Sequence, residues 1–178
     1  MAPLSEEDLR PGSDTARRRL PDIAPRLAMA GEAPLLAALV ERAYAPWVSV
    51  VGRRPAPMQD DYVARIAASQ AWVAEDGGGL AALAVVEERR DAAPPCLLLD
   101  NIAVEPDRHG TGLGLAMLRF VGQEALRRGL PEVRLYTNEK MERNIALYAR
   151  LGFTEAERRQ EGAFRRVIMA IPSEKLAG

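Results

Sequence analysis

The sequence predicts a single α/β domain with a mixed β-sheet flanked by helices. Three observations predict it: strand-like and helix-like segments alternate along the chain, one largely apolar segment is typical of a central strand, and a glycine-rich turn joins that segment to a helix. The chain has 178 residues, 48% of them hydrophobic, which suits one domain with its own core. We expect a flexible polar extension at residues 1–20 and the domain at residues 21–178.

The first half of the chain predicts a strand, two helices and a hairpin. A strand is expected within residues 23–30, a helix within 31–48 from apolar residues at helical spacing, and a short helix within 59–69. Between the helices, the segment GRRPAPM interrupts the pattern with a glycine and two prolines. Residues 70–91 read as two strands joined at residues 76–79, which is typical of a hairpin.

The second half predicts alternating strands and helices. The expected elements are a central strand at residues 96–104, a helix at 115–129, a strand at 132–137, a helix at 141–152 and closing strands at 153–159 and 164–171. The first of these helices carries Gly129 as its stop signal, and the second ends at Gly152. The order β-α-α-β-β-β-α-β-α-β-β favours one mixed sheet.

Composition excludes several classes of function. The formal net charge of -1 gives no electrostatic basis for binding nucleic acid or an acidic membrane surface. Cys96 is the only cysteine, which excludes a disulfide framework and favours a reducing compartment. No apolar run approaches the ~20 residues that span a bilayer, and the N-terminus lacks the apolar centre of a signal peptide. We therefore expect a cytoplasmic protein, and the lone histidine, His109, predicts no metal site.

The segment EPDRHGTGLGLAML joins the central strand to the next helix through three alternating glycines. Gly110, Gly112 and Gly114 let the backbone approach a ligand, and the first N–H groups of the helix point at it. Such a turn is an anion site, although a tight turn without a ligand remains open. Leu115 follows Gly114 where a P-loop needs lysine, and the spacing is one residue short of the dinucleotide fingerprint.

The same segment resembles the acyl-CoA loop of the GNAT N-acetyltransferase superfamily, written Gln/Arg-x-x-Gly-x-Gly/Ala. Aligned on Gly112 and Gly114, the Gln/Arg position falls on His109, a departure that bears only on one side-chain contact. The later segment LYTNEKMERNIALYARLGF is similar to the strand and helix of that superfamily that close with Tyr-x-x-x-Gly-Phe, here Tyr148, Gly152 and Phe153. The resemblance covers residues 25–172.

This resemblance implies acetyl-CoA as co-substrate and no metal. It implies that the central strand splays from the next, so that the pantetheine arm inserts like an extra strand. The implied acceptor is a primary amine of a small molecule, or of a protein lysine or N-terminus, and a homodimer is left open. The implied acetyl-CoA contacts are Ile102, Ala103, Val104, His109, Gly110, Thr111, Gly112, Leu113, Gly114, Leu115 and Asn144.

The chemistry of acetyl transfer asks for an acid, a base and donors to an oxyanion. The resemblance makes Tyr148 the acid that protonates the CoA thiolate, against the alternative of a tyrosine that packs on the sheet. Asn144 precedes it by one helical turn and so lies on the same face. Asp100 is a candidate base near the active end of its strand, with Glu105 as the alternative and a water chain with no single base also open.

Acceptor recognition is expected from the connection between the first two helices. Trp47, Arg53, Arg54 and Met58 lie there, and an arginine can hold a carboxylate through two hydrogen bonds. Asn101, beside Asp100, is a further candidate for orienting a substrate or a water molecule. The rival hypotheses are a non-catalytic acyl-CoA-binding or sensor module, which needs no proton donor, and a structural domain with an empty loop.

Overall fold

The computed structural model describes residues 20–162 and 164–178. The expected flexible extension lies outside the described residues except for Leu20. The described residues form a seven-stranded sheet in the order β1-β2-β3-β4-β5-β7-β6. Its strands are β1 (Arg26–Leu27), β2 (Ala71–Asp76), β3 (Gly79–Arg89), β4 (Cys96–Val104), β5 (Glu132–Asn138), β6 (Thr154–Glu161) and β7 (Phe164–Pro172). The β4–β5 pair is parallel and the other pairs are antiparallel, so the predicted mixed sheet is confirmed.

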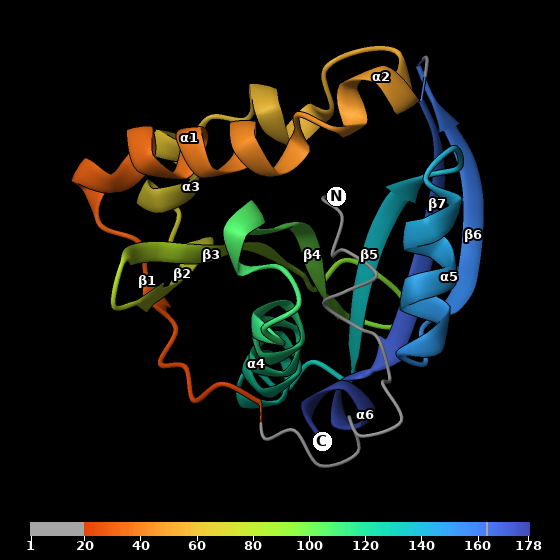
Figure 1. Ribbon diagram of the computed structural model, residues 1–178. Helices are drawn as coiled ribbons and strands as arrows, with labels where there is room; N and C mark the ends of the chain where they lie inside the picture. Colours follow the sequence, from red (N-terminus) through yellow and green to blue (C-terminus); the bar gives the residue numbers. More distant parts are fainter. Residues whose placement is uncertain (1–19, 163) are drawn as a thin grey trace.

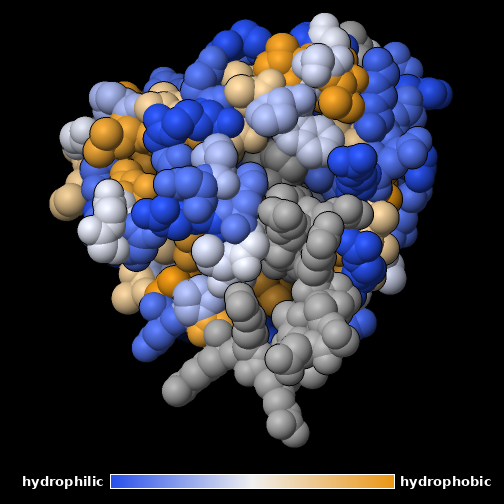
Figure 2. Space-filling view, in the orientation of Figure 1, coloured by the Kyte–Doolittle hydropathy of each residue, from blue (hydrophilic) through white to orange (hydrophobic). Residues whose placement is uncertain are grey.

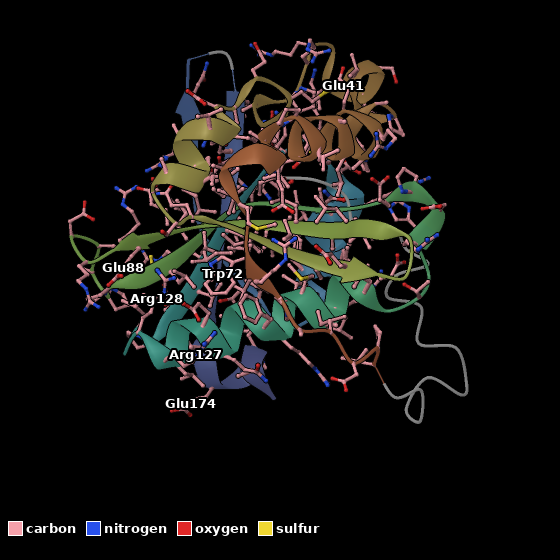
Figure 3. All side chains as sticks on the ribbon, turned by 90° about the vertical axis from the view of Figure 1, so that its left-hand side faces the viewer. Glu41, Trp72, Glu88, Arg127, Arg128 and Glu174 are labelled. Carbon is pink, nitrogen blue, oxygen red and sulfur yellow. The ribbon has the colours of Figure 1, made fainter. Side chains whose placement is uncertain are left out.

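Helices cover both faces of this sheet. The α-helices are α1 (Ala33–Tyr44), α2 (Trp47–Val51), α3 (Tyr62–Ala67), α4 (Leu113–Arg127), α5 (Glu142–Arg150) and α6 (Ser173–Ala177). Short 3-10 turns add η3 (Ala30–Glu32), η4 (Ala56–Gln59) and η5 (Pro106–Arg108). Figures 1 and 3 show α1 and α3 on one side of the sheet and α4 and α6 on the other, with α5 beside β6 and β7.

Two buried clusters fill the spaces between these layers. One joins α1 and α3 to β2 and β3 and includes Leu36, Leu39 and Tyr44. The larger one joins α4, α5 and α6 to the centre of the sheet. In Figure 3, Glu41 on α1 therefore lies on one side of the sheet, and Arg127 on α4 lies on the other.

Several predicted boundaries need correction. The helix expected within residues 31–48 is divided into α1 and α2, because Pro46, the residue before α2, has no N–H group to continue α1. The first strand is only the two residues of β1. The helix α6 was not predicted, because it is too short to show a hydrophobic period. The hairpin between β2 and β3 and the bounds of β4 are as predicted.

A β-bulge in β4 decides which way its polar residues point. In the pairing with β3, Val85 faces Asn101 and Val86 faces Leu99, so Asp100 is the extra residue. The bulge breaks the strict alternation of faces. As a result Asp100 and Asn101 both bond to partners on the α1 and α3 side of the sheet.

The docking of α6 on α4 depends on Gly122. A Cβ atom there would lie 2.6 Å from the backbone nitrogen of Ala177 and 2.9 Å from the carbonyl carbon of Leu176. We expect Gly122→Ala to lower the free energy of unfolding by about 1–3 kcal/mol, because backbone atoms of α6 must move. Urea unfolding measures this, with the exposed neighbour Gln123→Ala as the control. Equal stability of the two variants would contradict the prediction.

The molecular surface is largely polar on the face seen in Figure 2, where hydrophobic residues form small separate groups. Exposed large hydrophobic side chains among the described residues are Leu27, Met29, Leu35, Val50, Val63 and Leu126. No helix in the described part of the chain is long and apolar enough to cross a membrane.

Candidate active site

The glycine-rich turn forms the N-terminus of α4. Gly110 and Gly112 have φ angles of 77° and 86°, which residues with a Cβ atom rarely adopt. Gly112 is the N-cap of the helix. Within the described part of the chain no side chain caps this end. The N–H groups of Leu113, Gly114 and Leu115 belong to the first helical turn and have no carbonyl partner inside the helix. Together with the helix dipole they form a cradle for an anion.

In the glycine-rich turn, the side chains of Arg108 and Thr111 are already bonded, whereas His109 has a polar atom without a partner among the described residues. Arg108 is ion-paired with Asp76 and Asp107, and the hydrogen bond from Arg108 lowers the pKa of Asp76. The Thr111 hydroxyl donates to the carbonyl of Arg108 at 2.7 Å. His109 Nε2 is buried and has no hydrogen-bond partner among the described residues. A buried imidazole nitrogen without a partner fits a ligand atom at this place, so the residues present suit a pyrophosphate.

The strands β4 and β5 separate beyond Leu99. Their parallel pairing runs from Cys96 with Glu132 to Leu99 with Leu135, and in the described residues it goes no further. Past that point β5 continues to pair with β7, and β4 continues to pair with β3. The predicted splay is therefore confirmed. It leaves backbone groups of Ile102–Val104 without a strand partner on the β5 side, although their side chains are buried.

The helix α5 ends in a Schellman motif that explains the Tyr-x-x-x-Gly-Phe pattern. The N–H of Phe153 donates to the carbonyl of Tyr148 at 3.0 Å, and the N–H of Gly152 donates to Ala149 at 3.0 Å. Gly152 has a φ of 96°. The rings of Tyr148 and Phe153 meet edge-on with centroids 5.6 Å apart. The motif thus fixes both the end of the helix and the ring of Tyr148.

Tyr148 lies where the predicted cofactor elements meet. It is fully buried in a cluster that also contains Ile102 and Val104 of β4 and Leu113 of α4. Burial raises the pKa of the Tyr148 phenol well above its usual range. Asn144, one turn earlier, is also buried, with 1% of its surface exposed. The structure therefore brings together the strand, the loop helix and the two α5 side chains that the sequence analysis selected.

Asp100 lies on the opposite face of the sheet, in a polar cluster. One carboxylate oxygen accepts a hydrogen bond from Arg65 of α3, and the other accepts one from the hydroxyl of Tyr136. Arg65 also donates to Asp60 at 3.0 Å and to Gln70 at 2.9 Å. Both oxygens of Asp100 are thus in use, and Arg65 fixes α3 to β4.

Sequence reasoning missed Tyr136, Arg65 and Arg166. The guanidinium of Arg166 lies 4.0 Å from the centroid of the Tyr136 ring. Burial, followed by the negative charge of Asp100, raises the pKa of Tyr136 above its usual range. The alternation of β5 carried a signal for Tyr136, because Val133 and Leu135 face the core and Tyr136 faces away from it. Nothing in the sequence connects Arg65 to Asp100, 35 residues apart.

Of the four residues expected to recognise the acceptor, Arg54 and Met58 have contacts elsewhere in the protein. Arg54 is ion-paired with Glu41 of α1, with two bonds of 2.8 Å, and Met58 packs against the core. Trp47 is half-buried in α2, and Arg53 is exposed. The connection does border pockets, but through Val51, Pro55, Ala56, Pro57 and Gln59.

Asn101 is fully buried and its amide is bonded at both ends. The hydroxyl of Tyr44 donates to Oδ1 at 2.6 Å, and Nδ2 donates to the hydroxyl oxygen of Tyr62 at 3.1 Å. The expected direct contact between this side chain and a substrate does not fit that arrangement. Glu105, the alternative base, pairs with Arg42.

Two adjoining hollows share Asp100 and Tyr136. A pocket of 360 Å³ lies between the η4 turn, Arg65 and Asp100. A groove of 420 Å³ continues from Asp100 and Tyr136 over residues of β3, β5, β6 and β7. The groove is lined by four acidic and four basic residues, namely Glu87, Asp91, Asp100, Glu157, Arg89, Arg134, Arg159 and Arg166.

Cys96 borders the 420 Å³ groove but is not a reactive thiol. Cys96 is buried, and burial raises the pKa of its thiol. Among the described residues no group of three or more His, Cys, Asp or Glu side chains is placed to hold a metal ion.

Fold and site together define a class: an α/β domain with a glycine-rich turn at a helix N-terminus beside a splayed pair of parallel strands. The model of the acetyltransferase (GNAT) family matches residues 36–153. The chain belongs to this family, and the resemblance found in the sequence is confirmed.

Individual relatives agree with this family. The chain is 37% identical over 101 residues to the [ribosomal protein bS18]-alanine N-acetyltransferase of Escherichia coli, a match that spans 53% of this chain and 66% of that protein, just under two thirds of its length. The solved structure of that Escherichia coli enzyme superimposes with a TM-score of 0.60 at 23% identity, covering 85% of this chain and 94% of the other. An N-acetyltransferase from Thermoplasma acidophilum in complex with coenzyme A gives a TM-score of 0.66 at 14% identity, covering 83% and 98%.

A replacement of His109 tests the contact at the turn. We expect His109→Ala to raise the Kd for acetyl-CoA about tenfold, because a hydrogen bond to a charged group is lost. His109→Gln keeps an N–H donor and matches the family pattern, so it should bind close to wild type. Isothermal titration calorimetry measures both. Equal weakening by Ala and Gln, or none by either, would contradict the assigned contact.

Proposed function

We propose that this protein transfers the acetyl group of acetyl-CoA directly to a primary amine, in a ternary complex. The observation that carries the proposal is the opening between β4 and β5. It has the uncapped N-terminus of α4 at one side and Tyr148 with Asn144 at the other. The name of the Thermoplasma relative, solved with coenzyme A, supports the choice of donor.

Binding of acetyl-CoA follows from the backbone. The pyrophosphate is held by the N–H groups of Leu113, Gly114 and Leu115 in the first turn of α4, with His109 Nε2 as a further contact. The pantetheine arm pairs with the unpartnered edge of Ile102–Val104, as a strand added to a sheet, and Asn144 bonds to it from α5. Backbone groups of the same edge polarise the thioester carbonyl.

Transfer needs no covalent enzyme intermediate. The amine nitrogen attacks the thioester carbon, the C–S bond breaks, and the thiolate takes the proton of the Tyr148 hydroxyl. The raised pKa of Tyr148 keeps that proton in place before transfer. The buried Cys96, with its raised thiol pKa, is unsuited to act as an acyl carrier.

The proton of the amine passes to Asp100 or to water. Asp100 borders the pocket under η4, and Tyr136 donates to its carboxylate. Asp100 can accept the proton while Tyr136 and Arg65 stay bonded to it, because each carboxylate oxygen has two lone pairs. The polar cluster of Asp100, Arg65 and Tyr136 also positions water and the acceptor in the pocket that it borders.

The acceptor is a peptide N-terminus or a small primary amine. The relative from Escherichia coli is named for acetylating an alanine of ribosomal protein bS18. An open groove that begins at Asp100 and carries both signs of charge suits an extended peptide better than an enclosed pocket would.

The test is calorimetric titration with acetyl-CoA, combined with a free-thiol assay over a panel of amines. The panel contains peptides with N-terminal alanine, the same peptides N-acetylated as controls, lysine peptides and polyamines. Micromolar binding with thiol release on one class supports the proposal. Absence of binding would overturn it.

A non-catalytic acyl-CoA sensor is the second candidate. It is favoured by one observation: both oxygens of Asp100 already accept hydrogen bonds. Binding of acetyl-CoA without thiol release on any amine in the panel would support this function over transfer.

A further inference from the structure

A chain of buried hydrogen bonds connects β4 with the turn that borders the acceptor pocket. The chain runs from Tyr44 on α1 through Asn101 on β4 to Tyr62 on α3, and from there to the carbonyl of Pro57 in η4. The bonds measure 2.6, 3.1 and 2.8 Å in that order. Asn101, Tyr44 and Tyr62 are all buried, so water does not compete for these groups.

The donor and acceptor in each of the three hydrogen bonds follow from the Pro57 carbonyl, at which the chain of bonds ends. The Pro57 carbonyl can only accept, so the Tyr62 hydroxyl donates its hydrogen there. Tyr62 must then accept from Nδ2 of Asn101, which leaves Oδ1 to accept from Tyr44. Burial raises the pKa of both phenols, which keeps both hydrogens in place.

The turn that receives the last bond is part of the acceptor side. Pro57 and Ala56 border the 360 Å³ pocket next to Asp100 and Tyr136, which is called the acceptor pocket. Asn101, in the middle of the chain of bonds, directly precedes Ile102–Val104, the edge assigned to the pantetheine arm. The chain of bonds therefore connects the strand that is assigned to acetyl-CoA with the turn that borders the acceptor pocket.

We propose that Asn101 and Tyr62 are positioning residues that set the place of the η4 turn, and so the acceptor pocket, relative to β4. Tyr44 belongs to the same buried set, but its hydroxyl donates to Asn101 and not to the turn. The kinetic part of this inference rests on the proposed acetyl transfer, and the structural part does not.

Two matched variants test it. Tyr62→Phe removes the bond to Pro57 and the acceptor for Asn101, whereas Tyr44→Phe removes one bond to Asn101 and leaves the bond to Pro57. Tyr62→Phe loses two buried hydrogen bonds and Tyr44→Phe one, so thermal unfolding should report the larger loss of stability for Tyr62→Phe. They should differ at the turn.

The first measurement is amide hydrogen exchange over residues 55–60. We expect Tyr62→Phe to speed exchange of the Met58 and Asp60 amides about three- to tenfold, the worth of one hydrogen bond, and Tyr44→Phe to leave it near wild type. The second measurement is steady-state kinetics. Tyr62→Phe should raise the KM for the amine by a similar factor, with kcat and the Kd for acetyl-CoA close to wild type.

The outcomes separate this inference from the proposed function. Unchanged exchange in Tyr62→Phe, or the same change in both variants, would overturn the positioning role. Faster exchange in Tyr62→Phe with an unchanged amine KM would overturn its link to the acceptor. If the wild type acetylates no amine, the proposed transfer fails, and the exchange comparison alone still decides whether the chain of bonds holds the turn.

Discussion

Replacing Tyr148 with phenylalanine is expected to lower kcat for acetyl transfer by about 10²- to 10³-fold, the usual effect of losing a general acid. The Kd for acetyl-CoA should stay near wild type, because the phenylalanine ring keeps the edge-on contact with Phe153 and the burial in the cluster. Single-turnover kinetics with saturating acetyl-CoA, followed by thiol release, measures the effect on the chemical step. A tenfold rise in Kd with an unchanged kcat would instead make Tyr148 a packing residue.

The pH dependence offers an independent check of the same role. A general acid works below its pKa, and burial raises the pKa of Tyr148 above the ordinary ~10 of a tyrosine. The loss of activity that comes from deprotonating Tyr148 is thereby moved to higher pH. We therefore expect wild-type kcat not to fall between about pH 8 and pH 10 because of Tyr148. A fall that is present in the wild type and absent in Tyr148→Phe is not expected. Such a fall would mean that Tyr148 ionises in its ordinary range.

Replacing Gly112 with alanine is expected to raise the Kd for acetyl-CoA by about 10- to 100-fold. The left-handed conformation, with a φ of 86°, costs a residue with a Cβ about 1–2 kcal/mol. Leu20 Cδ2 and Pro21 Cδ would lie 3.3 and 3.4 Å from that Cβ atom, so backbone strain outweighs crowding there. When the N-cap relaxes, the first N–H groups of α4 no longer point to one place, and each bond to a charged phosphate is worth about 1.5–3 kcal/mol.

Gly129→Ala is the matched control for this variant. Gly129 follows the other end of α4, has a φ of 69°, and nothing lies within 4 Å of its Cβ position. It should cost a similar free energy of unfolding and leave the Kd for acetyl-CoA unchanged. Calorimetry and urea unfolding on both variants separate the two effects. Equal Kd values for Gly112→Ala and Gly129→Ala would show that the turn does not bind the pyrophosphate.

Local sequence patterns were sufficient to predict the structural features that depend only on residues close together in the chain. Gly129 and Gly152 end their helices because each supplies the left-handed residue of a Schellman motif within six positions. The β2–β3 hairpin follows from the glycines at its turn. The bounds of β4 follow from an uninterrupted apolar run with two polar residues inside it.

Local sequence patterns do not identify the hydrogen-bond partners of polar side chains near the acceptor pocket. The arginines of the first connection looked suited to a carboxylate, yet Arg54 is held by Glu41, which lies 13 positions earlier on α1. Asn101 looked suited to a substrate, yet two tyrosines from different helices use its amide. In both cases the sequence shows a polar side chain but not its hydrogen-bond partner, because residues distant in the sequence supply that partner.

The amino-acid sequence was enough to predict the order of the strands and longer helices, the glycine-rich turn and the helix that carries Tyr148, because each depends on residues within one turn or one strand. Tertiary packing sets the other features. It separated β4 from β5 beyond Leu99, placed the bulge at Asp100, and joined that carboxylate to Arg65 and Tyr136. The physical reason is distance along the chain: these contacts join residues 35 and 36 positions apart, and packing of the whole sheet selects them.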